Sequence, residues 1–413
     1  MSTPNPTIGS GHEGTLKDQF DAYLLRLKAG DMGSLPAIAA TVLLALLFAK
    51  LSPYFFTNLN FTNLFVQSAE LMMLSSALVF VIILAEIDLA AGVTAGVAMA
   101  VYITLVKDHG WTWIPALLAA FGTGIIIGWV IGFLVAKIGV PSFVVTLAFF
   151  LGFQGMQLVL LGEGGVYRIE QQQILSIMNN NIPVWGGWAM IAIAAGLVGI
   201  LGLWDRGRRS RAGLVNKPIS ILILRMGAVV VLGGAAVSIM NQDRSQGVIP
   251  IQGVPIVVPI TLVVLFIGSF VLERTRFGRH LYAIGGNPEA ARRAGIKVTR
   301  MRIYAFIVCA FLAVISGVFH ASRIGSVDGS AGHSIVLEGV AAAVVGGVSL
   351  FGGRGKLSNA AIGAIVITMI DNGLGLLQMP AGINFLVAGG VLLLAATIDA
   401  IARKRSGSSL ARV

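Results

Sequence analysis

The sequence has few charged residues and a single cysteine. Asp, Glu, Lys and Arg make up 11% of its 413 residues, whereas soluble domains contain about 25%. Hydrophobic residues make up 56% and the mean hydropathy is +0.88, which excludes an ordinary soluble domain and indicates a protein surrounded by lipid. Cys309 has no partner for an intrachain disulfide, and the scattered histidines lack the spacing of metal ligands, so we expect no metal site.

Apolar runs recur along the chain with lengths near the roughly 17–25 residues of a membrane-spanning helix. They lack the period-two alternation of barrel strands. The predicted fold class is therefore all-α, a polytopic membrane helix bundle with about 12 transmembrane segments. The expected segments are 35–52, 64–85, 89–106, 114–136, 142–161, 184–204, 219–240, 256–272, 303–322, 335–350, 357–377 and 383–400.

The basic residues predict an orientation, because Lys and Arg accumulate in cytoplasmic connections. With the N-terminus inside, the inner connections contain Arg206–Lys217, Glu273–Arg302 and the tail from Arg403. The formal charge of +11 is thereby explained without nucleic acid, and both termini are expected in the cytoplasm. The domains are a cytoplasmic arm over 1–34, a transmembrane domain over 35–402 with a cytoplasmic loop over 273–302, and a basic tail over 403–413. Within the bundle, Gly124, Gly128 and Gly132 recur every fourth residue and predict close helix packing.

The loop 273–302 contains the signal of a short helix. Asn287 is a favourable N-cap, Pro288 occupies the first helical position, and Glu289 suits the positive end of the helix dipole. Gly295 is a suitable C-terminal stop. A helix of about two turns is marginal alone, so this helix either is held by a partner or remains a solvated loop helix.

The segment around this helix, GRHLYAIGGNPEAARRAGI, resembles the coupling segment of sugar ABC-transporter permeases of the ribose/xylose class, in the branched-chain amino-acid-type permease superfamily. The resemblance runs from about Asn58 to Asp399. Further motifs in the same order are ILAEIDLAAG, VPSFVVTLAF, GVPIVVP, LEGVAAAVVGGVSLFGGRG and DNGLGLL. The spans that flank residues 206–217 look like the extra pair of the xylose-type permease.

The resemblance implies a transport subunit of the bacterial cytoplasmic (inner) membrane that works with other chains. The implied partners are a second copy in a homodimer, a cytoplasmic ATP-binding subunit and a periplasmic or extracellular sugar-binding protein. The implied coupling residues, which would dock into the ATP-binding subunit, are Asn287, Pro288, Glu289, Ala290, Ala291, Arg292 and Gly295.

The chain itself does not match the P-loop pattern G-x4-G-K-[ST]. Near Gly355 and Lys356, Leu350 stands at the first glycine position and Leu357 replaces the hydroxyl residue. We therefore expect no cofactor on this chain, with ATP and magnesium on a partner subunit. No H-E-x-x-H or G-x-S-x-G motif is present, so an enzyme is not expected and no catalytic residue is assigned.

Three interruptions of the apolar pattern are candidates for a translocation pathway. At the first, Glu86 and Asp88 lie between two runs, where Asp88 either caps the next helix or belongs to a broken helix that lines the pathway. The related family motif usually has glycine at the position of Glu86. The second is the segment 349–359. The third is Asp371–Gly373, where Asn372 either contacts a sugar hydroxyl or forms an interhelical hydrogen bond.

On the outer side, Glu163 and Arg323 are candidate contacts for the binding protein, and solvated loop charges are the alternative. The function expected from these observations is import of a monosaccharide, xylose or a related pentose or hexose, by alternating access. The alternative is an ion-coupled secondary sugar transporter acting alone. Such a transporter needs carboxylates within the membrane, and Glu86, Asp88 and Asp371 are the only ones that the sequence analysis identifies.

Overall fold

The structure is a computed structural model that describes residues 33–410, except 163, 215, 217, 246, 331 and 334. Residues 1–32 of the predicted arm and the candidate Glu163 lie outside the described residues. The chain forms two compact units, a smaller one built on residues 182–254 and a larger one that comprises 32–181 and 255–404. We describe each unit by itself.

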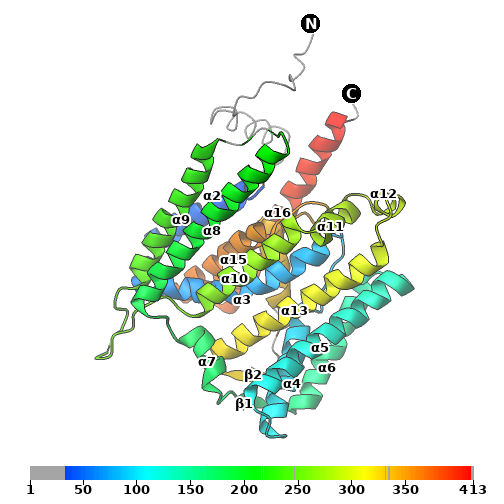
Figure 1. The fold of residues 1–413 in the computed structure, drawn as a ribbon. Helices are drawn as coiled ribbons and strands as arrows, with labels where there is room; N and C mark the ends of the chain where they lie inside the picture. Colours follow the sequence, from blue (N-terminus) through cyan, green and yellow to red (C-terminus); the bar gives the residue numbers. More distant parts are fainter. Residues whose placement is uncertain are drawn as a thin grey trace. The chain divides into compact units, whose positions relative to one another are not determined.

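The larger unit is almost entirely helical (Figure 1). Its elements are α2 (Leu35–Leu51), α3 (Asn58–Ile82), α4 (Ala91–Lys107), α5 (Trp113–Phe133), the π-helical turn η1 (Leu134–Ile138), α6 (Ser142–Leu161), β1 (Val166–Arg168), α7 (Gln172–Asn179), α10 (Val257–Arg274), α11 (Arg276–Gly286), α12 (Pro288–Arg293), α13 (Val298–Ile324), β2 (Ser326–Asp328), α14 (Ile335–Val345), α15 (Leu357–Leu376) and α16 (Ala381–Leu410). The all-α prediction is confirmed.

Each predicted apolar segment contains a helix, but the helices differ in length. In the described part of the chain, eight helices are long and apolar enough to cross a membrane, and four apolar helices are shorter. α14 has only 11 residues and spans about 16 Å at 1.5 Å per residue, roughly half of a 30 Å hydrocarbon core. It ends at Val345, before the predicted residue 350, because Gly346 packs against the backbone of Asn359 and Gly347 adopts a φ of +100°.

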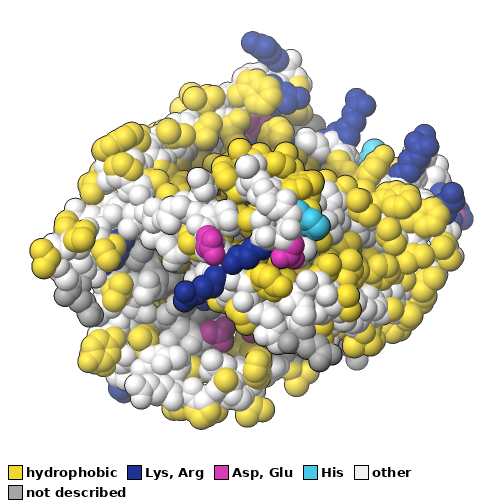
Figure 2. Space-filling model, turned by 90° about the horizontal axis from the view of Figure 1, so that it is seen from below, with side chains coloured by type: hydrophobic (Ala, Val, Ile, Leu, Met, Phe, Trp, Pro, Cys, Tyr) yellow, Lys and Arg dark blue, Asp and Glu magenta, His cyan; other side chains and the backbone are white. Residues whose placement is uncertain are grey.

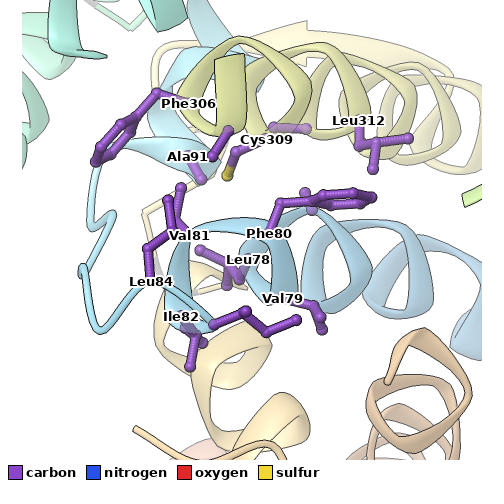
Figure 3. Close-up of a cluster of buried hydrophobic side chains, with 14 of the residues drawn as sticks. Leu78, Val79, Phe80, Val81, Ile82, Leu84, Ala91, Phe306, Cys309 and Leu312 are labelled. Atoms are coloured by element: carbon purple, nitrogen blue, oxygen red, sulfur yellow. The ribbon is translucent and has the colours of Figure 1, made fainter. Parts of the chain in front are cut away.

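The core of the larger unit lies between α3 and α13. In α3, 83% of the most apolar stretch is buried, because α13, α14 and α15 pack around it. Figure 3 shows Phe80 of α3 facing Leu312 and Cys309 of α13, with Ala91 of α4 beside them. This continuous apolar contact fixes the two helices from which most of the polar groups described below project.

The glycine pattern in α5 brings α5 against α13. A Cβ added to Gly128 would lie 2.6 Å from the carbonyl oxygen of Phe306, and one added to Gly132 would lie 2.8 Å from the Cα of Ile303. No side chain fits between the two backbones at these points. The predicted role of these glycines in close helix packing is confirmed.

The two ends of α13 carry different structures. At one end β1 pairs antiparallel with β2, with Val166 opposite Asp328 and Arg168 opposite Ser326. At the other end, α11 and α12 precede α13 (Figure 1). The connection between α6 and α7 is thereby joined to the connection between α13 and α14, far from the loop that contains α12.

The smaller unit consists mainly of α8 (Val184–Arg211) and α9 (Ile219–Met240), which pack side by side. In the loop that follows, the Arg244 guanidinium donates to the carbonyl oxygens of Met240 and Gly253. The Asp243 carboxylate accepts from the backbone N–H groups of Ser245 and Ile251, and these hydrogen bonds lower its pKa. These hydrogen bonds from the two side chains to backbone groups of the same loop hold its conformation.

Candidate coupling and transport sites

α12 is the short helix that the sequence predicts. The Asn287 side chain accepts from the N–H of Ala290 at 2.9 Å, Pro288 occupies the first turn, and Gly295 follows the helix with a φ of +81°. Glu289 forms ion pairs with Arg292 at 3.4 Å and with Arg293 at 3.6 Å. Of the predicted coupling residues only Ala291 is buried, where it packs into the core. The other predicted coupling residues are exposed, so this face of α12 is accessible to a partner.

α11 connects this exposed helix to two distant segments. The Tyr282 hydroxyl donates to the carbonyl oxygen of Gly355 at 2.6 Å, and burial, together with Glu273, raises the pKa of Tyr282 to about 12. Gly285 lies directly against the carbonyl oxygen of Ile83, which also accepts from the N–H of Gly353 at 2.8 Å. α11, the α3–α4 link and the α14–α15 loop therefore meet at one point.

The sequence analysis did not predict α11, although two signals for it were present. Thr275 caps the helix by accepting from the N–H of Gly278. Phe277, Leu281 and Ile284 recur at helical spacing, and Leu281 and Ile284 are fully buried. The charged residues between them obscured this apolar face.

The α3–α4 link confirms the first predicted interruption. α3 ends at Ile82 and α4 begins at Ala91, and Ala85 between them has a φ of +60°. Oε1 of Glu86 lies 3.2 Å from Nε of Arg302, in the first turns of α13. Asp88 is buried and accepts from the N–H of Ala90 at 2.9 Å. The N-cap of α4 is Ala90, so the alternative that placed Asp88 at this position is wrong by two residues.

The α14–α15 loop confirms the second interruption. At the third, the helix is unbroken, and Asn372 follows the alternative of an interhelical hydrogen bond. α15 continues through Asp371, Asn372 and Gly373 to Leu376. Asn372 exchanges hydrogen bonds of 2.9 and 3.0 Å with Asn60 of α3, and Gly373 leaves room for the ring of Phe48. These contacts stabilise a continuous helix, and the geometry of Asn372 is that of the interhelical hydrogen bond.

A buried carboxylate in α3, Glu70, was overlooked when Glu86, Asp88 and Asp371 were treated as the only intramembrane carboxylates. Oε1 of Glu70 lies 2.7 Å from Nδ1 of His320, and Oε2 accepts from Nε of Arg323 at 3.1 Å. The Glu70 side chain is 3% exposed. An ionisable residue within the apolar run 64–85 was the signal that could have found it, because such residues are rare in spans and usually functional.

Arg323, predicted to contact a binding protein, is the partner of this buried carboxylate. Its side chain is 39% exposed, so it reaches from Glu70 to the surface. Figure 2 shows the β1–β2 end, where a few charged and His side chains gather near the middle of a mainly hydrophobic and uncharged face.

Two cavities lie in the larger unit. The smaller has a volume of about 20 Å³ and is lined by Glu70, Leu74, Gly92, Ser316, His320 and Gly332, among others. The larger has a volume of about 440 Å³, and Asp88 is the only charged residue in its described lining. Small-molecule pockets usually measure roughly 300–1,000 Å³ and contain several polar groups. The smaller cavity thus contains Glu70, His320 and Ser316 among mainly apolar walls, and the larger is almost wholly apolar.

The comparisons with known proteins agree with this picture. Residues 60–396 match the family described as "Branched-chain amino acid transport system / permease component". The chain belongs to this permease family. The permease is 35% identical over 351 residues to the xylose transport system permease protein XylH of Escherichia coli K12, which covers 84% of this chain and 86% of that protein.

Two further relatives cover most of the permease. XylH of Haemophilus influenzae is 33% identical over 380 residues, covering 89% of this chain and 96% of its own. The ribose import permease protein RbsC of E. coli K12 is 30% identical over 372 residues, covering 90% and 95%. No solved structure matches the chain significantly. The resemblance to the ribose/xylose class is confirmed, and the permease is a multi-pass protein of the inner membrane.

Proposed function

We propose that the permease is the transmembrane subunit of an ATP-driven importer that moves a monosaccharide, xylose or a related pentose or hexose, into the cytoplasm. Its similarity to two xylose permeases and a ribose permease supports the substrate class. The observation that carries the proposal is α12, which is exposed and capped, and which α11 ties to the α3–α4 link and the α14–α15 loop.

In the proposed orientation, α12 and both termini face the cytoplasm and β1–β2 faces outward. About 12 segments cross or enter the membrane, and the short α14 enters it without spanning it alone. The basic segments at 206–217 and 273–302 support this orientation. The sugar-binding protein contacts the β1–β2 end, where Arg323 is available, and Glu163 remains a predicted contact.

The proposed cycle has no covalent chemistry on this chain. The ATP-binding subunit, which carries ATP and magnesium, holds α12 through Asn287–Gly295, and its closure moves α13 and α11. The Glu86–Arg302 ion pair transmits this movement to the α3–α4 link, because Arg302 is one turn into α13. ATP and the binding protein favour different conformations of the permease, which alternates the side to which the pathway opens.

A second copy completes the proposed assembly as a homodimer. Large apolar side chains such as Leu386, Leu393 and Leu394 of α16 are exposed on the single chain. Lipid and a second copy are the surroundings that such a surface accepts. The number of copies in the assembly follows from the mass of the purified complex.

Uptake of labelled pentoses and hexoses tests the proposed function. A strain that lacks this chain should accumulate one of these sugars only when the chain is restored together with its ATP-binding subunit and binding protein. Proteoliposomes that contain the permease alone should not transport the sugar.

An ion-coupled transporter is the second candidate, because Glu70, His320 and Arg323 form the kind of intramembrane charge cluster that coupling ions use. Uptake by the permease alone, driven by an ion gradient, would establish this alternative and overturn the first.

A further inference from the structure

The smaller unit carries an arginine within the apolar surface of α9. Arg225 is the seventh residue of this helix, and its side chain is exposed. Its neighbours Ile223 and Leu224 are exposed as well, by 63% and 68%. In the part of the chain that the structure describes, Arg225 has no hydrogen-bond or ion-pair partner. A charged side chain on a surface that suits acyl chains is costly unless an anion accompanies it.

Contacts between α8 and α9, which lie side by side (Figure 1), give the depth of Arg225. Two glycines of α8 pack against two side chains of α9, Gly199 against Met226 and Gly202 against Leu222. Arg225 lies between these two side chains along α9, so it is level with the two glycines. Arg206, the first arginine of α8, is about 6–10 Å further toward the end of that helix at 1.5 Å per residue. A long arginine side chain can cover most of this distance.

The basic end of α8 has two faces, and one of them continues the contact with α9. Arg206 and Arg209 follow Gly202 by four and seven residues, a spacing that keeps side chains on one side of a helix. Both are partly buried. Arg208 and Arg211 do not continue this spacing, and they are exposed. Arg206 and Arg209 are therefore the arginines of α8 that face the helix carrying Arg225.

The charges at this end of the smaller unit are not balanced. Residues 205–225 contain six basic residues and one acidic residue, a net charge of +5. The acidic residue, Asp205, forms an ion pair with Arg209 at 3.5 Å. The sequence has no other carboxylate side chain between residues 182 and 242. An anion from outside this segment would therefore offset the repulsion between the arginines.

The surroundings of Arg225 select the kind of anion. Basic pockets between membrane helices on the cytoplasmic side bind anionic lipid headgroups, and a guanidinium donates two parallel hydrogen bonds to phosphate oxygens. The exposed Ile223 and Leu224 accept acyl chains. A soluble anion or an acidic protein surface would have to leave water to reach the same level, which is costly.

We propose that α8 and α9 form a binding site for an anionic phospholipid, an inference that rests on the proposed orientation and goes beyond the proposed transport function. The lipid phosphate lies between Arg225 and the turn Arg206–Arg209, and the acyl chains lie along Ile223 and Leu224. The phosphate offsets the repulsion between the arginines and holds the cytoplasmic ends of α8 and α9 together.

Titration of the purified permease with phosphatidylglycerol tests this site, with bound lipid counted by native mass spectrometry. Phosphatidylcholine, which has no net charge, should bind more weakly. Arg225→Gln should lower the affinity for phosphatidylglycerol about tenfold and leave that for phosphatidylcholine unchanged. Arg211→Gln is the matched control, because it removes an equal charge from the exposed face. Its effect should stay below about twofold, since salt screens an exposed charge. Equal binding of the two lipids, or an equal loss in both variants, overturns the site.

Two further measurements separate the lipid from other anions. Inorganic phosphate at millimolar concentration should not displace phosphatidylglycerol, and displacement would show a site for a soluble anion instead. If Arg225→Gln weakened assembly with the ATP-binding subunit but left lipid binding unchanged, Arg225 would serve a protein contact and the lipid site would be overturned. None of these measurements requires a sugar. A permease that transports no sugar would refute the proposed function, and the titration would still decide whether the lipid binds.

Discussion

The two ends of α13 hold their charges differently. At the α12 end, Arg302 pairs with Glu86, and the two side chains are 28% and 12% exposed. At the β1–β2 end, the almost fully buried Glu70 has two partners, His320 and Arg323. A partly exposed single pair contributes little to stability and can exchange partners, whereas breaking a buried pair is costly. The comparison teaches that the Glu86–Arg302 pair can separate at little cost in free energy when the helices move. The Glu70 carboxylate, in contrast, leaves its two partners only when other polar groups replace them.

The largest expected effect is at the buried end. Arg323→Met should lower the free energy of unfolding by about 2–3 kcal/mol, somewhat below the value for fully buried pairs because Arg323 reaches the surface. Adding Glu70→Gln should restore part of this loss, because it removes the charge that was left with fewer partners. Thermal unfolding in detergent measures both effects. If the double variant lost as much free energy of unfolding as the two single variants added together, the comparison would be contradicted.

At the other end, α12 should be sensitive in function more than in stability. Gly295→Ala places a side chain at a φ of +81° and should cost about 1 kcal/mol locally. Glu289→Ala removes two exposed ion pairs and should cost less. Both variants should insert normally and hydrolyse ATP in the complex, but lose most of their sugar uptake. Unchanged uptake in both would show that α12 is a solvated loop helix.

The Glu86–Arg302 pair should give a smaller effect. Glu86→Gln and Arg302→Gln should each change stability by less than about 1 kcal/mol and slow uptake several-fold. The exchange variant Glu86→Arg with Arg302→Glu should recover part of the uptake rate. Transport assays at equal membrane levels check this, and an exchange variant slower than either single variant would argue against transmission through the pair.

The smallest effect is expected at Asp328, in β2. Its partial burial raises its pKa, but hydrogen bonds from Ser330 outweigh this effect and leave the pKa lowered. A lowered pKa in the folded state stabilises the protein above the unfolded-state pKa, and the contribution is lost as the pH falls through the folded-state value. Asp328→Asn should therefore change stability by less than about 1 kcal/mol at neutral pH and remove an acid-dependent component below about pH 4. Melting curves from pH 3 to 7 measure this difference.

Local signals predicted the long apolar helices and α12, but contacts between distant residues required the structure. Asn287, Pro288 and Gly295 determine α12 through their own backbone preferences, so the sequence sufficed. Asn372 appeared to interrupt a span because its partner, Asn60, is far away in the sequence. The same limit applies to Glu70, whose role depends on residues 250 and 253 positions later.

The contacts of the predicted site residues could be anticipated to different degrees for the same reason. Glu86 was identified from its place between two apolar runs, but its pairing with Arg302 was not, because no local pattern joins them. Arg323 was assigned to the surface from its position at a span end, and only the packing of α13 on α3 brings it to Glu70. Sequence patterns locate polar groups in a membrane bundle, and tertiary packing decides which of them meet.

The close approach of α5 to α13 has a mechanical consequence. At Gly128 and Gly132 the backbones of α5 and α13 are in direct contact. No side chain lies between them there that could change rotamer and absorb a tilt, so the two helices behave as one rigid pair. A force applied to α12 would therefore move both helices together. The π-helical turn η1, at the end of α5 beside α13, is the point at which this pair can bend.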